Sequence, residues 1–165
     1  MLVPHSSLPL LRIKDLRNNS SVQFVAERGY PPNARVYESD IIYTRTGQIG
    51  LVFRGRSGVL HNNCFKVRPK SMINNDYLFW WLQSTVFRNR ITVLASKAAQ
   101  PDITHSLFKA QSILVPPKEF QEKSTKTIID LSSETHRLES IYHRKHAALD
   151  ELKKSLLHQA FNGEL

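Results

Sequence analysis

The sequence predicts an α+β fold: a mixed α/β globular domain over residues 1–117, followed by one long C-terminal α-helix over residues 118–165 that forms a coiled coil. Three observations predict it. All eight prolines and five of the six glycines lie in residues 1–118. The same part carries short apolar runs between turn residues, the pattern of β-strands. After Pro117 there is no further proline, no glycine before Gly163, and apolar residues at heptad spacing.

The globular part is expected to hold several short strands and one helix. Five apolar runs predict strands at residues 9–13, 22–26, 40–44, 49–53 and 64–68. Residues 28–35 and 53–58 have the composition of turns. Residues 74–91 have apolar side chains at helical spacing, and Asn75 or Asp76 is placed to cap this helix. Residues 112–117, "SILVPP", predict a last strand that the two prolines end.

The C-terminal part predicts a helix from Phe120 to Phe161, about 60 Å long at 1.5 Å per residue. Its apolar residues follow a/d heptad positions, with Thr135 and Lys145 as polar members. Gly163 is placed to stop the helix. Such a stripe needs a partner helix, most simply from a second copy, so a homodimer is expected. The alternative is a helix that folds back over its own domain. The predicted dimerisation seam consists of Ile128, Leu131, Leu138, Tyr142, Leu149, Leu152 and Leu156.

The net charge of +9 is unevenly distributed. Residues 1–118 hold 16 Lys+Arg against 6 Asp+Glu, whereas residues 119–165 hold 7 against 8. A concentrated basic excess is the electrostatic footprint of a nucleic-acid-binding protein. The alternative is a basic surface without a dedicated partner. A basic helix lying on a membrane is less favoured, because the cations fall in strand and loop sequence.

Composition also narrows the cellular setting. No apolar run approaches the roughly 20 residues that a membrane span needs, and the N-terminus lacks the pattern of a secretory signal. Cys64 is the single cysteine, which excludes an internal disulfide and a cysteine-cluster zinc site. It is expected to pack as a small buried hydrophobe in a protein of the reducing cytoplasm.

Several motifs of catalytic or cofactor-binding proteins fail on context. Residues 50–57 match the spacing of a phosphate-binding P-loop, with Arg56 in place of lysine, but the spacer is strand-like and no helix follows. His136, His143 and His146 favour a solvated helix face over a metal site, and His61 lacks a metal-ligand set nearby. The carboxylates of residues 1–118 show no catalytic spacing. The sequence therefore predicts a binding module without cofactor, metal or catalytic residues, rather than an enzyme.

Polar residues in predicted loops are the candidates for contacts with double-stranded DNA. Arginine can grip the edge of guanine, glutamine can pair with adenine, and lysine and threonine suit phosphates. Gly47 and Gly50 are expected to let a strand–loop–strand turn approach other backbone or DNA closely. The candidate contact residues are Arg12, Lys14, Arg17, Arg45, Thr46, Gln48, Arg54, Arg56, Lys97, Gln100 and His105.

Five segments in order resemble the target-recognition domain and spacer helix of the specificity subunit of Type I restriction–modification systems. They are "DIIYTRTGQIGLV", "GVLHNNCFKVRP", "YLFWWLQS", "AAQPDITHSLFKAQSILVPP" and "LDELKKSLLHQAFNGEL", and the resemblance covers about residues 38–165. It implies a recognition domain that reads a few base pairs and a spacer helix that pairs with another. It also implies partners, the modification (methyltransferase) and restriction subunits, which supply the catalysis.

The family's subunit carries two recognition domains and two spacers, so this chain resembles half of one. Two copies are expected to recognise a two-part, gapped, palindromic site. The chain departs from the family in "PPKEFQEK", where the spacer entry "PPLxEQ" has an altered register, and in starting close to "LPLLRIKDL", which predicts a shortened N-terminal part. The alternative functions are a coiled-coil assembly module without DNA binding, a decayed remnant of a specificity subunit, and an independent enzyme.

Overall fold

The computed structural model describes residues 2–96 and 101–163. The chain divides into two compact units, residues 1–122 and 123–165, and each is described by itself. The division falls within the last helix, α5 (Lys118–Asn162). The observed architecture is α+β, as the sequence predicts.

The first unit is built on three small sheets. In the central sheet β5 (Ile41–Thr44) lies between β6 (Val52–Phe53) and β8 (Cys64–Val67), and both pairings are antiparallel. All four residues of β5 are buried, because packed side chains cover both faces of this sheet. This explains the unbroken apolar run in "DIIYT".

The second sheet joins distant parts of the chain. Strand β7 (Gly58–Leu60) pairs in parallel with β2 (Leu10–Leu11) and antiparallel with β4 (Arg35–Val36). A Cβ atom at Gly58 would lie 2.5 Å from the carbonyl oxygen of Pro9, so only glycine lets the strands approach this closely. A two-stranded sheet of β1 (Leu2–Val3) and β3 (Phe24–Val25) completes the unit.

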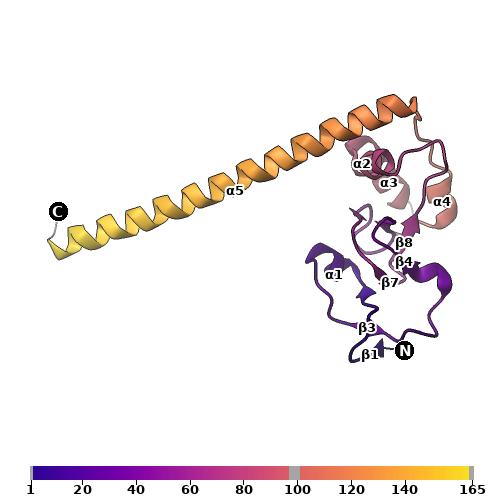
Figure 1. Cartoon of the computed structure of the whole chain (residues 1–165), viewed down its shortest axis with the longest axis horizontal. Helices are drawn as coiled ribbons and strands as arrows, with labels where there is room; N and C mark the ends of the chain where they lie inside the picture. Colours follow the sequence, from indigo (N-terminus) through magenta and orange to yellow (C-terminus); the bar gives the residue numbers. More distant parts are fainter. Residues whose placement is uncertain (1, 97–100, 164–165) are drawn as a thin grey trace. The chain divides into compact units, whose positions relative to one another are not determined.

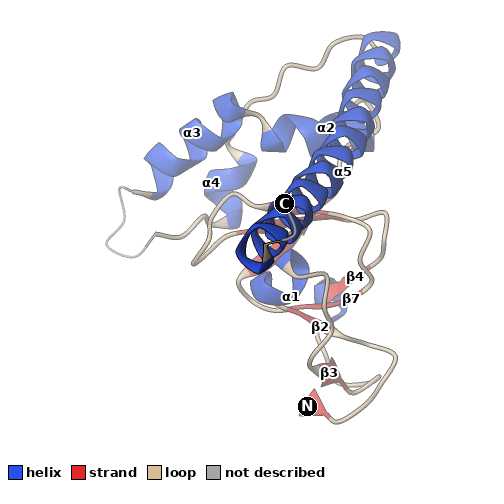
Figure 2. Ribbon diagram, turned by 90° about the vertical axis from the view of Figure 1, so that its left-hand side faces the viewer, coloured by secondary structure: helices blue, strands red, loops and turns tan. Residues whose placement is uncertain are grey.

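Within residues 2–96 and 101–117, five short helical segments accompany the sheets: α1 (Ile13–Arg17), the 3₁₀ turn η1 (Pro32–Ala34), α2 (Asn75–Gln83), α3 (Thr85–Ala95) and α4 (His105–Lys109). Figure 2 shows α2, α3 and α4 gathered on one side of the central strands, with β3 toward the opposite end. An aromatic cluster fills the space between these helices and the central sheet. Its rings belong to Tyr43, Phe65, Phe87 and Phe108.

The predicted helix at residues 74–91 is wrong in two details. Asn74, rather than Asn75 or Asp76, caps α2 by accepting hydrogen bonds from two backbone N–H groups. The helix also breaks at Ser84, which has an extended backbone and accepts a hydrogen bond from the N–H of Phe87 at 3.2 Å. The Ser84 hydroxyl caps a second helix, so α3 starts in a new direction.

The predicted strand at residues 112–117 is also wrong, because this segment belongs to no sheet of the described residues. Leu114 is 79% exposed, and Ile113 packs against the aromatic cluster. The segment therefore has strand-like sequence without a strand partner.

The second unit contains α5 from Lys123 onward. The bounds of α5 agree closely with the predicted helix from Phe120 to Phe161 (Figure 1). Gly163 follows its end with a φ angle of +71°, as expected of a glycine that stops a helix. Among the helices of the described residues, α5 included, none combines the length and apolarity that a bilayer-spanning segment requires.

Candidate nucleic-acid interface

Four of the six carboxylates in residues 1–118 are bound by arginines of the same unit. Such pairs are locally neutral, so the basic excess of the unit comes from its other cations. Three of these arginines were candidate DNA contacts. The pairs are Asp15 with Arg12, Asp40 with Arg68, Asp76 with Arg54 and Asp102 with Arg45.

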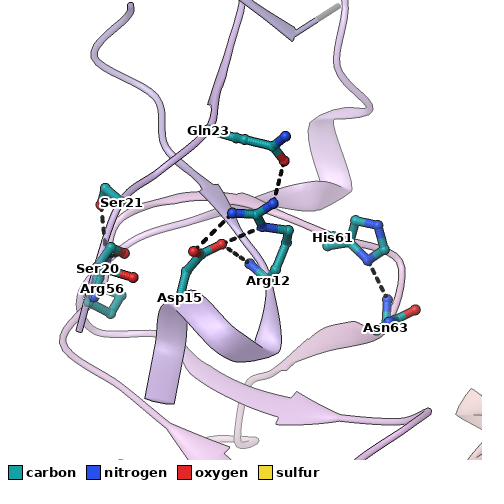
Figure 3. Close-up of polar contacts among 8 residues, drawn as sticks. All are labelled: Arg12, Asp15, Ser20, Ser21, Gln23, Arg56, His61 and Asn63. Atoms are coloured by element: carbon teal, nitrogen blue, oxygen red, sulfur yellow. Dashed lines mark hydrogen bonds and ion pairs between the residues drawn. The ribbon is translucent and has the colours of Figure 1, made fainter. Parts of the chain in front are cut away.

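Arg12 organises the start of α1 (Figure 3). Its Nε lies 2.6 Å from Oδ2 of Asp15, and its Nη1 donates to Oε1 of Gln23 at 2.6 Å. The Asp15 side chain is 1% exposed. Burial opposes its ionisation, but the hydrogen bonds and charge of Arg12 more than offset that cost and lower the pKa of Asp15. The guanidinium of Arg12 is thus engaged in holding the fold.

Arg45 fastens the end of β5 to the residues that precede α4. Its Nε and Nη2 donate to the two carboxylate oxygens of Asp102 at 2.9 and 2.5 Å. The backbone N–H of Ile103 donates to the carbonyl of Arg45, and Thr46 forms a β-bridge with Asp102. Hydrogen bonding to Arg45 lowers the pKa of Asp102, so the pair stays ionised at neutral pH. Arg54 has a similar role, since it pairs with Asp76 of α2 and lies over the ring of Phe79.

The turn between β5 and β6 carries Gln48 outward. Gly47 and Gly50 have φ angles of +71° and +83°, which other residues adopt at a cost. The hydroxyl of Thr44 accepts a hydrogen bond from the N–H of Leu51 at 2.9 Å and fixes the base of the turn. The predicted strand–loop–strand turn is confirmed. Its predicted close approach to other backbone is wrong, because among the described residues a Cβ atom on Gly47 would meet nothing within 4 Å and one on Gly50 only the Tyr43 hydroxyl at 3.6 Å.

This turn meets α1 through two exposed side chains. Nη1 of Arg17 donates to Oε1 of Gln48 at 3.0 Å, joining residues 31 positions apart. Lys14 lies one helical turn before Arg17 and is exposed as well. The pairing places an arginine, a glutamine and a lysine together on the surface.

Arg56 extends the same surface from the β6–β7 turn. Its guanidinium donates to the Asn19 side chain at 2.6 Å, to the carbonyl of Ser20 at 2.7 Å and to the Ser21 hydroxyl at 3.0 Å. Figure 3 shows it beside Ser20 and Ser21. These partners are neutral, so Arg56 keeps its net charge. We call Lys14, Arg17, Asn19, Gln48 and Arg56 the α1 surface.

The remaining candidates lie elsewhere. Thr46 is half-buried, and His105 at the start of α4 is exposed with its ring 4.9 Å from that of Phe65. Arg45 and His105 line a hollow of about 490 Å³ beside β8, together with Lys66, Lys109 and Asn62. We call it the outer groove. Lys97 and Gln100 lie outside the described residues. Sequence reasoning missed Lys66, Lys109 and Asn19; only Asn19, in an "NNSS" turn, carried a local signal.

The predicted seam of α5 is exposed along its length. Leu131, Tyr142 and Leu149 are 64%, 68% and 65% exposed. Near the C-terminus, Leu149, Leu152 and Leu156 line a shallow apolar groove together with Leu157 and Ala160. Each of these side chains is available to another helix.

The P-loop-like segment and the histidines of α5 have structural rather than catalytic or metal-binding surroundings. The P-loop-like residues 50–57 end β6 and lead into β7 rather than into a helix. His136 pairs with Glu139 and His146 with Asp150 on the exposed face of α5. Across residues 2–96 and 101–163, no three His, Cys, Asp or Glu side chains are grouped to hold a metal ion. Cys64 is buried, which raises the pKa of its thiol to about 12.

One comparison with known proteins identifies a family, and a second identifies a similar fold. Residues 7–143 match the model of the Type I restriction modification DNA specificity domain. The fold is similar to a chain from a solved structure described as the "structural basis underlying complex assembly and conformational transition of the type I R-M system". The TM-score is 0.81 at 16% sequence identity, covering 99% of this chain and 41% of that one. A comparison with curated proteins finds no match.

Proposed function

The chain belongs to the Type I restriction modification DNA specificity domain family, and from that premise we propose that it recognises a DNA sequence through the α1 surface. In this proposal residues 1–117 are the recognition domain and residues 118–165 the spacer and dimerisation helix. The protein acts by binding, and partner methyltransferase and restriction subunits supply the chemistry.

The observation that carries the proposal is the contact between Arg17 and Gln48. Both side chains are exposed and come from different elements, and their bond holds the guanidinium and the amide side by side. Arginine suits the O6/N7 edge of guanine and glutamine the N6/N7 edge of adenine. The pair is therefore suited to read adjacent bases in the major groove.

Lys14 and Arg56 are proposed to position the duplex. Lys14 is an exposed cation, and the printed partners of Arg56 are uncharged. Contacts of this kind go mostly to phosphates, add affinity without sequence preference and weaken as salt rises.

We assign the other candidates by their contacts. Arg12, Arg45 and Arg54 are bound to carboxylates of the fold, so their proposed role is to position the loops. Thr46 and His105 remain proposed DNA contacts of a second segment. Lys97 and Gln100, which lie outside the described residues, remain proposed contacts on their residue types alone.

We propose that α5 pairs with α5 of a second copy through its exposed seam. The chain spans 41% of the length of the solved structure's chain. In this proposal each copy contributes the recognition domain of residues 1–117. Two copies would present two domains to a bipartite, palindromic site, as helices of this length can bridge a DNA turn of about 34 Å. The alternative, an assembly module without DNA binding, predicts no salt-dependent affinity for DNA.

The test compares substitutions in the assembled complex with methyltransferase subunits. Arg17→Ala should weaken binding to the selected target by about 5–150-fold, corresponding to about 1–3 kcal/mol, and relax the preference at one base pair. Lys14→Ala should weaken target and random DNA alike and reduce the salt slope by about 0.9. Arg88→Ala removes an equally exposed cation from α3 and is the control. Equal loss of target and random DNA binding in Arg17→Ala would remove its assignment as a base reader.

A further inference from the structure

The central sheet has a free edge at β8. The sheet order is β6–β5–β8, so β8 has a neighbour on one side within the described residues. The N–H of Arg45 donates to the carbonyl of Asn63 at 2.8 Å, next to the register that pairs Tyr43 with Phe65 and Ile41 with Val67. In an antiparallel ladder the hydrogen-bonded pairs alternate. The N–H and C=O of Lys66 therefore point away from β5.

A groove runs along this edge. The outer groove continues into a second hollow of about 420 Å³, the inner groove, and the two share Phe65, Lys66, His105 and Lys109. The inner groove has an apolar floor of side chains from α2, α3 and α4, including Trp81, Phe87 and Phe108. An unpaired strand edge over an apolar floor is the setting in which proteins add a strand from outside.

The segment that was expected to be a strand contributes to the inner groove. Ile113 of this segment and the preceding Gln111 are among the residues that line it. Within the described residues, no acceptor is found for the backbone N–H groups of residues 112–115. Two carbonyls of this segment accept hydrogen bonds from side chains: Arg90 donates to Ser112 and Tyr77 to Leu114. Strand-like sequence without a strand partner thus lines the same hollow as the free strand edge.

The charges around the groove restrict the kind of strand that can bind there. Lys70 and Lys109 are exposed at its rim, Lys66 lies on the edge strand, and neither hollow is lined by a carboxylate. An occupant with carboxylates would be complementary to these cations. A second copy of this chain offers no such strand, because four of the six carboxylates in residues 1–118 are already paired. The other two, Glu27 and Glu38, lie outside its strands.

We propose that the β8 edge and its groove are a docking site for an acidic β-strand of a different protein, with apolar side chains at alternate positions. Its backbone pairs with Lys66, its apolar side chains cover the aromatic floor, and its carboxylates meet Lys70 and Lys109. This site goes beyond DNA recognition and does not involve the α1 surface, although His105, a proposed DNA contact of the second segment, lines both hollows.

The probe is an eight-residue peptide of alternating glutamate and valine, titrated against the full chain. Saturable binding should appear together with slowed hydrogen exchange at the amides of Lys66 and Arg68. Two further peptides carry N-methyl groups on one or the other set of alternate backbone nitrogens, and at least one should bind about tenfold more weakly, because it cannot pair with the edge. Equal binding of all three peptides, or none, would overturn the proposal.

Charge is tested separately. The double substitution Lys70→Glu with Lys109→Glu should weaken the acidic peptide by about tenfold or more, and a peptide of alternating lysine and valine should then bind better. Arg88→Glu, the control, reverses an exposed charge outside the groove and should change nothing. If hydrogen exchange at the Lys66 amide slows in the chain alone as its concentration rises, the occupant is a second copy and the proposal is wrong. If DNA slows this exchange, the occupant is nucleic acid and the proposal is also wrong.

Discussion

Gln121 is the side chain whose loss should most clearly destabilise the first unit, to which it and its partners belong. It is fully buried in the first turns of α5. Its Oε1 accepts from the N–H of Asn74 at 2.7 Å, and its Nε2 donates to the carbonyls of Met72 at 3.1 Å and Pro116 at 2.7 Å. The amide thus ties the entry of α5 to the cap of α2. Gln121→Leu keeps the side-chain size and removes all three bonds.

The expected cost follows from these contacts. Each hydrogen bond contributes about 0.5–1.5 kcal/mol, and leaving a partner unpaired costs more when water cannot reach it. Asn74 and Pro116 are partly buried and Met72 is exposed, so water can satisfy some of these groups. We expect Gln121→Leu to lower the free energy of unfolding by about 2–4 kcal/mol. For a chain of this size that corresponds to a Tm lower by about 5–15 °C.

Circular dichroism and calorimetric melting measure this loss. Gln83→Leu is the matched control, because Gln83 makes a single bond to the carbonyl of Phe79 within its own helix. The control should cost less than about 1 kcal/mol. If Gln121→Leu melts within about 2 °C of the unmodified protein, the amide does not fasten the helix and the reasoning is refuted.

Three further predictions follow from the seam, the sheets and the ion pairs. Leu152→Asp puts a charge into the seam of α5 and should dissociate the dimer in sedimentation; an intact mutant dimer would refute the seam. Gly58→Ala should lower the free energy of unfolding, measured in urea, by about 1–3 kcal/mol or more, because its Cβ atom would meet a backbone carbonyl. The control Gly55→Ala has open space around it and a positive φ, and should cost about 1 kcal/mol. Equal costs for the two variants would contradict the close approach at Gly58. The free energy of unfolding should stay constant above about pH 4 and fall as pH drops below 3.8 through the lowered carboxylate pKa values, because the unfolded chain then binds more protons than the folded one. Urea midpoints that rise on acidification from pH 5 to pH 3 would contradict the ion pairs of Asp15, Asp40 and Asp102.

The sequence predicted the elements whose apolar pattern extends over enough consecutive residues to be recognised locally. The heptad pattern located α5, and apolar runs located the central strands β5, β6 and β8. It missed α1 and α4, which are too short for a helical period, and β7, which lies in turn-like sequence. Strand β7 forms because Gly58 admits β2, a contact between distant residues. Residues 112–115 have strand propensity, but a strand also needs a neighbour.

The sequence predicted the candidate site by residue type, and the structure separated exposed candidates from those that pair with carboxylates of the fold. An arginine looks the same in the sequence whether it faces solvent or a carboxylate. Arg45 and Asp102 are 57 positions apart, and nothing local indicates their pairing. The contact between Arg17 and Gln48 is equally non-local, although both residues were among the candidates. Gln121 was overlooked because a polar residue at the start of a helix is usually exposed.

The central claim is that this chain reads DNA sequence, and selection of bound duplexes from a random pool tests it most directly. The protein is assembled with methyltransferase subunits, and bound DNA is recovered and sequenced at two salt concentrations. If the chain reads DNA sequence, a gapped, palindromic two-part motif should be enriched, with affinity that falls as salt rises. Arg17→Ala should then broaden one position in each half of the motif. Recovery of a pool with no enriched sequence, from the complex and from the chain alone, would contradict it.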